Sequence, residues 1–400
     1  MKNTASKNAF LLVAILSTLV AIGVHIYLTQ HFYAVKFGTL EGSSVCNINA
    51  TFNCDTVTAS KFSSFLGIPM AMWGVATNLI LLFLLCITRW NLVQDRSQTS
   101  RYAFIVAGLT VLGSIIMGGI SMFAMTAYCI FCISTYVLSL IGFFGAWKGA
   151  DDVSISNIKN DIQDSFVTER WFLGSLIAIP VFAFLANFMY TESHGYGEME
   201  KIAKQNVAYW ASSPEQKFTE NGLILQKGSE TAVMTIVEFA DFLCPHCKHA
   251  APSLHTFTNN HPDVKLIFKP WPIDGTCNEA VQGGGDGLRC ALATSVICSE
   301  KLDKKGWVAH DYIFENQENI FASPSLDKHL EGVAKVTGIS LEDLNKCLKD
   351  PATAELIRSM AKEGAEAKIQ GTPTVFVNGR LLNGGQMIPI LEETYKTLKK

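Results

Sequence analysis

The sequence predicts a membrane α-helical protein with a soluble α/β domain in its C-terminal half. Hydrophobic residues make up 49% of the 400 residues and charged residues only 17%, a balance that indicates membrane spans. Beyond residue 228, short runs rich in β-branched residues alternate with segments of helical periodicity, which is typical of an α/β domain. We therefore expect a four-helix transmembrane bundle, a fifth transmembrane helix and a soluble α/β domain with a helical insertion.

Five apolar spans are expected in the first half of the chain. Residues 9–29, 67–87 and 171–190 contain no Asp, Glu, Lys or Arg, and each reaches the roughly 20 residues that a spanning helix needs. The uncharged stretch 102–147 is too long for one span and fits two, with a turn near residues 126–129. The first segment exceeds the apolar core of a secretion signal and lacks small cleavage-site residues after it, so we expect it to remain as a helix.

Lys and Arg gather in alternate connections between these spans. One set of connections holds Lys2, Lys7, Arg89, Arg96, Arg101, Lys148, Lys159 and Arg170, whereas the first loop of the other set holds Lys36 and Lys61. Because positively charged loops stay in the cytoplasm, we expect the N-terminus inside and the chain after Tyr190 outside. In a bacterium this is the inner membrane, with the C-terminal domain in the periplasm. The expected parts are 1–150 (four-helix transmembrane domain), 151–170 (cytoplasmic loop), 171–190 (fifth transmembrane helix), 191–228 (linker) and 229–400 (soluble domain).

Net charge and the positions of the cysteines limit which partners and which redox compartment are expected. The formal net charge is −3 and no basic run occurs, so nucleic acid is not an expected partner. Of the 11 cysteines, all but Cys86 fall on the predicted outer side or at its membrane face, where disulfides persist. We interpret Cys86 as an apolar filler.

A Cys-x-x-Cys motif, Cys244-Pro-His-Cys247, lies at the start of the predicted helix 244–259 and directly follows an apolar run that predicts a buried strand. A cysteine at a helix N-terminus is stabilised as a thiolate, which favours the reduced form and makes the disulfide a strong oxidant. Zinc would need two more ligands, and a disulfide across so short a loop contributes little stability. We therefore predict electron transfer by this motif and no metal site.

The rest of the soluble domain is predicted from its pattern. Residues 263–271 alternate like a second strand, residues 286–366 have helical periodicity, and Asn-Gly at 378–379 predicts a hairpin before a closing helix. Four cysteines lie in or just before the helical segment. Their spacing suggests structural disulfides, namely Cys277 with Cys290 and Cys298 with Cys347.

A Gly-Thr-Pro-Thr sequence precedes the hairpin. Pro373 lies where a proline fits at a strand start or in a cis bond. Together with Cys-Pro-His-Cys, Glu238 six residues before its first cysteine, and the helical insertion, this pattern resembles the DsbA-like branch of thioredoxin-fold proteins over residues 229–400.

That resemblance implies roles for several residues. Cys244 would be the exposed attacking sulfur, Cys247 its buried partner, and a cis Pro373 would face both. Glu238 would be the buried acid below the helix, with Lys269 as a candidate partner. The resemblance also implies a thioredoxin-like fold for the soluble domain.

A second Cys-x-x-Cys, Cys129 and Cys132, lies at the outer end of the fourth predicted span. Thr135, Tyr136 and Ser139 follow at helical spacing, so a polar, redox-active stripe runs into an otherwise apolar helix. Polar groups inside a bilayer are costly and usually functional, although hydroxyl side chains also occur in ordinary helix packing. A dithiol with a tyrosine one turn deeper fits a lipid-soluble two-electron carrier, for which quinone is the obvious candidate.

A third pair, Cys46 and Cys54, lies in the first outer loop with seven residues between its members, a spacing that leaves it flexible enough to act as a shuttle. Ser60 follows in an amphipathic segment, Gly-Ile-Pro opens the second span, and Cys-x-x-Cys-x-x-Thr-Tyr opens the fourth. This constellation resembles the vitamin K epoxide reductase family over residues 9–147.

The second resemblance implies an order of exchange within the membrane domain. Cys46 would meet the soluble partner, Cys54 would exchange with Cys129, and Cys132 would face the quinone. Ser60 and Tyr136 would then lie near the quinone ring. For both hydroxyl residues, helix packing is the alternative interpretation.

The two resemblances together imply a quinone-coupled thiol-disulfide oxidoreductase that forms disulfides in exported proteins. The expected order of electron carriers is Cys244/Cys247, Cys46/Cys54, Cys129/Cys132 and a membrane quinone, either ubiquinone or menaquinone. Expected partners are reduced unfolded exported proteins, membrane lipid and the quinone pool. Two alternatives stay open: a disulfide isomerase or reductase that uses the same cysteines, and a membrane-tethered binding module whose thiols are incidental.

Overall fold

The computed structural model divides the chain into two compact units. We call Met1–Ala34 with Ser44–Gly197 the membrane unit, and Val35–Ser43 with Glu198–Lys400 the soluble unit. The structure describes residues 2–37, 44, 46–48, 51–125, 127–167, 170–226 and 231–400. Each unit is described by itself below.

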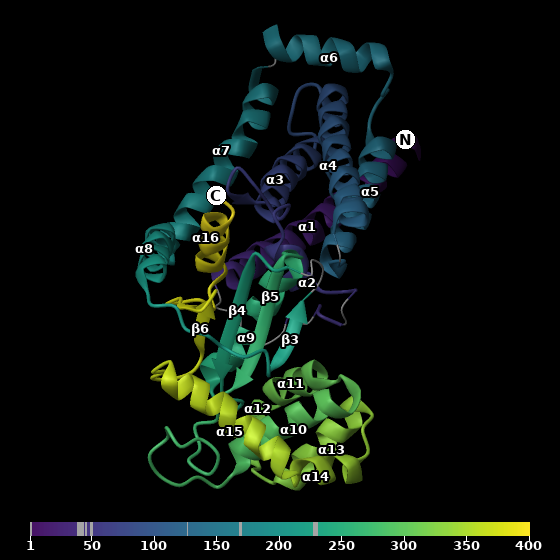
Figure 1. Ribbon diagram of the computed structural model, residues 1–400. Helices are drawn as coiled ribbons and strands as arrows, with labels where there is room; N and C mark the ends of the chain where they lie inside the picture. Colours follow the sequence, from purple (N-terminus) through teal and green to yellow (C-terminus); the bar gives the residue numbers. More distant parts are fainter. Residues whose placement is uncertain are drawn as a thin grey trace. The chain divides into compact units, whose positions relative to one another are not determined.

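Five helices of the described chain are long and apolar enough to cross a membrane. They are α1 (Lys2–Phe37), α3 (Met70–Arg89), α4 (Arg96–Ala124), α5 (Ile130–Gly149) and α7 (Arg170–Ser193) (Figure 1). All five expected spans are therefore confirmed as helices. The turn expected near residues 126–129 separates α4 from α5, and its residue Thr126 lies outside the described residues.

Shorter elements complete the membrane unit. A short helix, α2 (Cys54–Ala59), and a small hairpin of β1 (Ser64–Phe65) and β2 (Ile68–Pro69) lie between α1 and α3. The segment expected as a cytoplasmic loop forms α6 (Ile155–Val167). This helix is tied to α4 by a buried ion pair between Arg101 and Asp161.

Helix α5 packs closely against α1 through glycine. A Cβ atom added at Gly145 would lie 2.8 Å from the carbonyl oxygen of Phe10 and 2.9 Å from the backbone nitrogen of Ala14. Any larger residue at this position would push the two helices apart. Small residues at helix interfaces are the usual means of close packing in membranes, so this contact holds α5 and its cysteine-bearing end in position against α1.

The soluble unit is built on a five-stranded sheet with the order β3-β5-β4-β6-β7. The strands are β3 (Leu223–Gln226), β4 (Met234–Ala240), β5 (Val264–Pro270), β6 (Thr374–Val377) and β7 (Arg380–Leu381) (Figure 1). The apolar strand before the soluble Cys-x-x-Cys is β4, and it is central as expected, parallel to β5 and antiparallel to β6. The Asn-Gly hairpin is also confirmed, since Asn378 and Gly379 both have positive φ angles, of 46° and 77°, as this turn requires.

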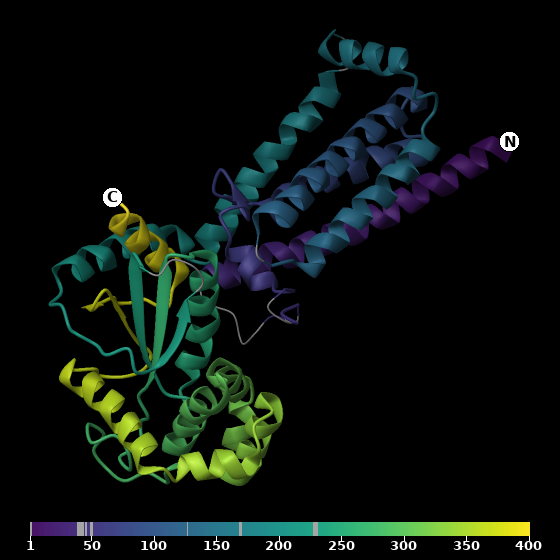
Figure 2. The ribbon, with the colours of Figure 1, turned by 45° about the vertical axis from the view of Figure 1, so that its right-hand side comes forward.

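Helices cover both faces of the sheet. The core on one face joins residues of α8 (Met199–Ser212), α9 (Pro245–Asn260) and α16 (Ile388–Leu398), and the core on the other face contains Ala361 of α15 (Pro351–Glu366). The predicted helical insertion, residues 286–366, comprises α10 (Leu288–Asp303), α11 (Gly306–Glu315), α12 (Gln317–Ala322), α13 (Leu326–Thr337), α14 (Leu341–Leu348) and also α15. Figure 2 shows the first five of these helices gathered at one end of the sheet.

The segment 191–228, expected to be a linker, instead supplies two elements of the soluble unit. Helix α8 buries Ala203, Val207 and Trp210 in the core, because their spacing of three to four residues forms one apolar face. Strand β3 pairs with β5 at the edge of the sheet. Between the end of α7 at Ser193 and the start of α8 at Met199 there is only a short turn that includes a 3-10 helix, so the connection is much shorter than the sequence suggested.

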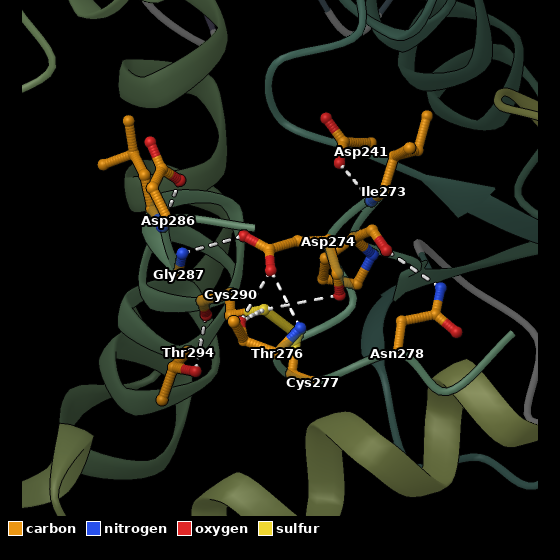
Figure 3. The surroundings of a disulfide bond; sticks show 12 residues. Asp241, Ile273, Asp274, Thr276, Cys277, Asn278, Asp286, Gly287, Cys290 and Thr294 are labelled. Carbon is orange, nitrogen blue, oxygen red and sulfur yellow. Dashed lines mark hydrogen bonds between the residues drawn. A yellow bond between two sulfur atoms is a disulfide. The ribbon is translucent and has the colours of Figure 1, made fainter. Parts of the chain in front are cut away.

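Two disulfides brace the insertion, with the pairing that the spacing suggested. Cys277 bonds to Cys290, and Cys298 of α10 bonds to Cys347 of α14. Figure 3 shows the loop around the first of these bonds, where one carboxylate organises the backbone. The side chain of Asp274 accepts hydrogen bonds from the backbone nitrogens of Thr276 and Gly287, each at 3.0 Å.

Candidate active sites

The soluble Cys-x-x-Cys lies at the N-terminus of α9, directly after the central strand. Cys244 is the N-cap residue and Pro245 is the first helical residue, a position where proline costs no hydrogen bond. The side chain of Cys244 is 8% exposed and that of Cys247 is fully buried. Cys244 is therefore the more accessible sulfur, although it is less exposed than the resemblance implied.

The loop before β6 lies against these thiols. The Thr372–Pro373 peptide bond is cis, and the carbonyl oxygen of Thr372 accepts a hydrogen bond from the Cys244 thiol at 3.3 Å. A cavity of about 420 Å³ lies beside this contact, lined by His246, His249, Ala250, Thr372, Pro373, Gln386 and Met387. The structure thus brings the predicted Cys244, Cys247 and Pro373 together next to an open space that a peptide could enter.

The two thiols differ in acidity. The hydrogen bond with Cys247 lowers the pKa of Cys244 from its ordinary value of 9.0 to about 5, and backbone N–H groups at the start of α9 act in the same direction. Burial raises the pKa of Cys247 well above 9.0, and the nearby charge of Cys244 adds to this. At neutral pH Cys244 is therefore the thiolate, which is the nucleophilic form of cysteine.

Glu238 lies on β4 and is buried, as predicted. Burial raises its pKa from 4.5 to about 8, and one of its carboxylate oxygens has no hydrogen-bond partner among the described residues. The candidate partner Lys269 is wrong, because it pairs in register with Phe239 and not with Glu238. Neighbouring residues of a strand point to opposite faces, so Lys269 lies on the other face and donates to Glu363 of α15 at 2.7 Å.

Two further side chains hold the loop before α9, and the sequence analysis missed both. Asp241 accepts hydrogen bonds from the backbone nitrogens of Leu243 and Ile273, each at 2.7 Å, and pairs with Arg289 (Figure 3). From α12, the amide nitrogen of Gln317 donates to the carbonyl oxygens of Phe242 at 2.8 Å and Cys244 at 3.1 Å. The helical insertion is thereby fastened to the cysteine motif.

In the membrane unit, the loop disulfide lies beside the second Cys-x-x-Cys. Cys46 and Cys54 are bonded, and both belong to one buried cluster with Cys129. Two backbone hydrogen bonds hold the loop there: Tyr128 donates to the oxygen of Thr51 at 2.7 Å, and Asn53 donates to the oxygen of Tyr128 at 3.1 Å. The residues immediately before Cys54 and Cys129 are thus fixed to one another.

Cys129 is the N-cap residue of α5, as Cys244 is of α9. Its sulfur accepts a hydrogen bond from the backbone nitrogen of Cys132 at 3.1 Å. Cys129 is buried, whereas Cys132 faces a cavity of about 240 Å³. The stripe predicted on this helix lines the same cavity with Thr135, Tyr136 and Ser139, and most of the other lining residues are apolar.

Ser60 is not among the described residues that line this cavity. It is the C-cap of α2, and its hydroxyl donates to the carbonyl oxygen of Val57 at 2.7 Å. Ser63, one turn further on, does line the cavity. Thr58, two residues before Ser60, lines it as well, and a role of Ser60 near the quinone stays a prediction.

Histidines of α1 were missed by the sequence analysis. His25 lines the cavity, and its Nδ1 is buried with no hydrogen-bond partner among the described residues. Its ring lies over Gly74 of α3, where an added Cβ would come within 2.4 Å of it. His31 lies 2.9 Å from the carboxylate of Asp55, the residue after Cys54, and both side chains are buried. The signal was available, because a histidine inside an apolar span is costly and usually functional.

The cavity fits the head of a quinone. It is apolar along most of its wall, it exposes one sulfur of a dithiol, and it contains a buried imidazole nitrogen without a partner among the described residues. A quinone carbonyl accepts a hydrogen bond from an imidazole N–H, and a buried polar atom left unpaired is costly unless a ligand or water satisfies it. Cys132 and His25 are therefore the residues that would face such a molecule.

Known proteins resemble both units. The model of the vitamin K epoxide reductase family matches residues 11–147, and the model of the DsbA-like thioredoxin domain matches residues 235–396. Disulfide bond formation protein D of Bacillus subtilis (strain 168) is 30% identical over 181 residues, which are 43% of this chain and 76% of that protein. The probable disulfide bond formation protein D of Bacillus anthracis is 26% identical over 163 residues, covering 39% of this chain and 70% of that protein.

Among solved structures, oxidised BdbD from Bacillus subtilis matches 47% of this chain and 98% of its own, with 25% identity and a TM-score of 0.38. The geometry of the two cysteine motifs and the matches to both families agree on the kind of chemistry. The chain is a membrane-bound thiol-disulfide oxidoreductase that joins a domain of the vitamin K epoxide reductase family to a DsbA-like thioredoxin domain of the kind found in disulfide bond formation proteins.

Proposed function

We propose that this chain is a complete relay that takes two electrons from the thiols of an exported protein and delivers them to a membrane quinone. The main observation in support is that the two Cys-x-x-Cys motifs differ in which of their two cysteines is accessible. In the soluble motif the first cysteine, Cys244, is the accessible one. In the membrane motif the second cysteine, Cys132, faces a cavity.

Each step of the relay is a disulfide exchange in which one sulfur–sulfur bond breaks as another forms. A substrate thiolate attacks Cys244 in the Cys244–Cys247 disulfide, and the second substrate thiol resolves the mixed disulfide, leaving the substrate oxidised and the motif as a dithiol. Cys244 then attacks Cys46 of the loop disulfide and releases Cys54 as a thiolate, and Cys247 resolves the bond between Cys244 and Cys46, which restores the soluble disulfide. Cys54 attacks Cys129 of the Cys129–Cys132 disulfide and releases Cys132, and Cys46 resolves the bond between Cys54 and Cys129, which restores the loop disulfide.

Cys132 is the last thiol of this path. A quinone bound in the cavity would supply the acceptor for two electrons and two protons per disulfide formed. Tyr136 and His25 line the same cavity as Cys132, and a phenol hydroxyl or an imidazole N–H donates hydrogen bonds to a carbonyl oxygen. Either ubiquinone or menaquinone matches a cavity whose wall combines apolar side chains with hydroxyl groups, so the choice between them is left to the quinone pool of the cell.

The direction of transfer is supported by the acidity of Cys244. Because its pKa is lowered to about 5, the reduced soluble motif is stabilised as a thiolate at neutral pH, and its disulfide is correspondingly oxidising. Such a motif withdraws electrons from an unfolded substrate. An isomerase or reductase that receives electrons from the membrane is the second candidate, and a binding module with incidental thiols is the third.

The proposed site of action is the outer face of a bacterial inner membrane, with reduced unfolded exported proteins as substrates. The charges of the membrane unit support this orientation. Lys7 and Arg96 both pair with Asp151, directly after α5, at the end of that helix opposite Cys129. Positively charged connections stay in the cytoplasm, so this end would be inside and the cysteine end outside.

The test is quinone reduction by the purified full chain. The oxidised protein in detergent receives a reduced unfolded protein and a short-chain quinone, and quinone absorbance is followed. We expect reduction that is lost in Cys132→Ala and kept in Cys86→Ala, which removes a thiol of the same unit. Equal rates for Cys132→Ala and the unaltered chain would refute the relay. If Cys244→Ala and Cys247→Ala together abolish substrate oxidation, the binding-module alternative is excluded.

A further inference from the structure

Two histidines and an aspartate converge in the soluble unit away from its thiols. His255 lies on α9, and His310 and Asp311 lie on α11, with one potential ligand atom of each within 4.8 Å of the others. The carboxylate oxygen Oδ1 of Asp311 is 2.8 Å from Nδ1 of His310 and 3.8 Å from Nδ1 of His255. The two imidazole rings are stacked with their centres 5.2 Å apart.

One side of this cluster is buried against aromatic residues, and the other side is open to solvent. The side chain of His310 is fully buried and its ring packs edge-on against Phe268, Trp307 and Phe314. Its Nε2 atom is buried without a hydrogen-bond partner among the described residues, so the polar contacts of the ring go through Nδ1. The side chain of Asp311 is 53% exposed. An ion could therefore reach the ligand atoms from solvent while the aromatic wall holds His310 in place.

We propose that His255, His310 and Asp311 bind a divalent transition metal ion of the zinc class. Two imidazole nitrogens and one carboxylate oxygen, with an open position for water, form a recurrent zinc ligand set. Ligands at about 2.1 Å from a tetrahedral ion lie roughly 3.4 Å apart, and the separations of 2.8 Å and 3.8 Å bracket that value. The ligand atoms of the two imidazoles lie within 4.8 Å of one another, so the site would be completed by rotation of the rings out of their stacked arrangement.

The sequence did not reveal this site because its ligands come from distant segments. No Cys-x-x-Cys or His-x-x-x-His spacing marks it, and His255 is separated from the other two ligands by strand β5 and helix α10. Only the packing of α9 against α11 brings them together.

The proposed ion would clamp the cysteine-bearing helix to the insertion. His255 follows Cys244 by eleven residues, or about 16 Å along the helix, too far for the ion to touch the thiols. It would add a further link between α9 and the insertion, beside the ion pair of Lys248 with Glu318 at 3.1 Å and the contacts of Gln317 with the loop before α9. The inference concerns stability and does not depend on the proposed relay.

The test uses Co²⁺ as a coloured substitute for Zn²⁺, with the full chain in detergent. All cysteine pairs are first oxidised, since thiols also bind these metals, and bound metal is removed with a chelator. We expect one Co²⁺ per chain with the visible absorption of a tetrahedral site, displaced by one equivalent of Zn²⁺. We also expect Zn²⁺ to raise the melting temperature of the soluble unit by several degrees.

Variants assign the ion to these ligands. His255→Gln and the surface change Asp311→Asn should each weaken metal binding by about 100-fold or more, since even changes around a metal site cost 10- to 100-fold. His261→Gln alters a histidine just after the same helix that bonds to Phe257 and Glu392 instead, and should bind as the unaltered chain does. Absence of tetrahedral Co²⁺ absorption, or unchanged affinity in both ligand variants, would overturn the proposal.

Discussion

The two Cys-x-x-Cys motifs of this chain are built alike and presented in opposite ways. In both, the first cysteine is the residue before the helix and the second lies in its first turn. In the soluble unit, the first cysteine lies beside an open cavity and the second is buried above Glu238. In the membrane unit, the first is buried beside the loop disulfide and the second faces an apolar cavity.

The comparison indicates that the Cys-x-x-Cys motif at a helix start determines the type of reaction, which is thiol–disulfide exchange. The residues around the motif determine which molecule can react with it. Both motifs exchange two electrons, because both place a thiol at the positive end of a helix. Under the proposed relay, a peptide would reach Cys244 past the loop of Pro373, whereas a molecule dissolved in lipid would reach Cys132. Substitutions at each end should therefore affect different partners.

Single cysteine substitutions should distinguish the substrate-facing step from the quinone-facing step. With a reduced unfolded protein as donor, Cys244→Ala and Cys132→Ala should each lower quinone reduction by at least about 1,000-fold, as removal of a nucleophile does. With a small dithiol that reaches the loop disulfide directly, Cys244→Ala should keep the activity and Cys132→Ala should not. Both rates are read from quinone absorbance, and a Cys244→Ala variant that is inactive with both donors would contradict the separation.

The acidity of Cys244 should appear in its alkylation rate. The thiolate fraction rises with pH through a pKa of about 5, so the rate with iodoacetamide should reach half its maximum near pH 5 and stay constant above pH 7. At pH 7 this is about 100 times the thiolate fraction of a thiol with the ordinary pKa of 9.0. Mass spectrometry of the reduced full chain measures the rate at this residue. A midpoint above pH 8 would contradict the assignment of Cys244 as nucleophile.

Glu238 should make the soluble unit less stable as pH rises. Its pKa is raised from 4.5 to about 8, so the folded chain keeps a proton that the unfolded chain releases, and stability is lost between these values. Replacing Glu238 with Gln should remove about 3 kcal/mol of this loss between pH 4.5 and 7.5. Urea unfolding of the soluble unit within the full chain measures it, with the exposed Glu220→Gln as the control. Parallel pH profiles for Glu238→Gln and the unaltered chain would rule out a buried neutral acid.

The smallest effect is expected in the membrane cavity. Gly74→Ala would push the ring of His25, because the new Cβ comes within 2.4 Å of it. Gly113 lines the same cavity, and a Cβ atom added there would have no atom within 4 Å, so Gly113→Ala is the matched control. We expect Gly74→Ala to raise the KM for quinone by about tenfold, equivalent to 1.4 kcal/mol of binding, and Gly113→Ala to leave it nearly unchanged. Equal KM values in both variants would exclude His25 from the quinone site.

The sequence was sufficient for the membrane spans, the central strand and the structural disulfides. Long uncharged runs identify spans by a rule that needs no tertiary information, and the run before Cys244 predicted the central strand. The spacing of Cys277, Cys290, Cys298 and Cys347 also suggested the disulfides that the structure contains.

What the sequence could not supply depends on register and distance. Lys269 is close to Glu238 in the sheet, but the pairing of β4 with β5 turns it to the other face. The segment 191–228 was expected to be a linker because it is polar, although three apolar residues on one face of α8 are enough to bury it. His25 over Gly74, and His31 beside Asp55, are contacts between helices that no local pattern encodes.

The central claim is that electrons enter at Cys244 and leave at Cys132, and time-resolved trapping tests it most directly. The fully oxidised chain is mixed anaerobically with a reduced unfolded protein, quenched with an alkylating agent at intervals, and each cysteine is scored by mass spectrometry. We predict that thiols appear first at Cys244/Cys247, then at Cys46/Cys54 and last at Cys129/Cys132, and that added quinone removes them in the reverse order. Thiols at Cys129/Cys132 in a Cys244→Ala chain, at the rate of the unaltered chain, would contradict the account.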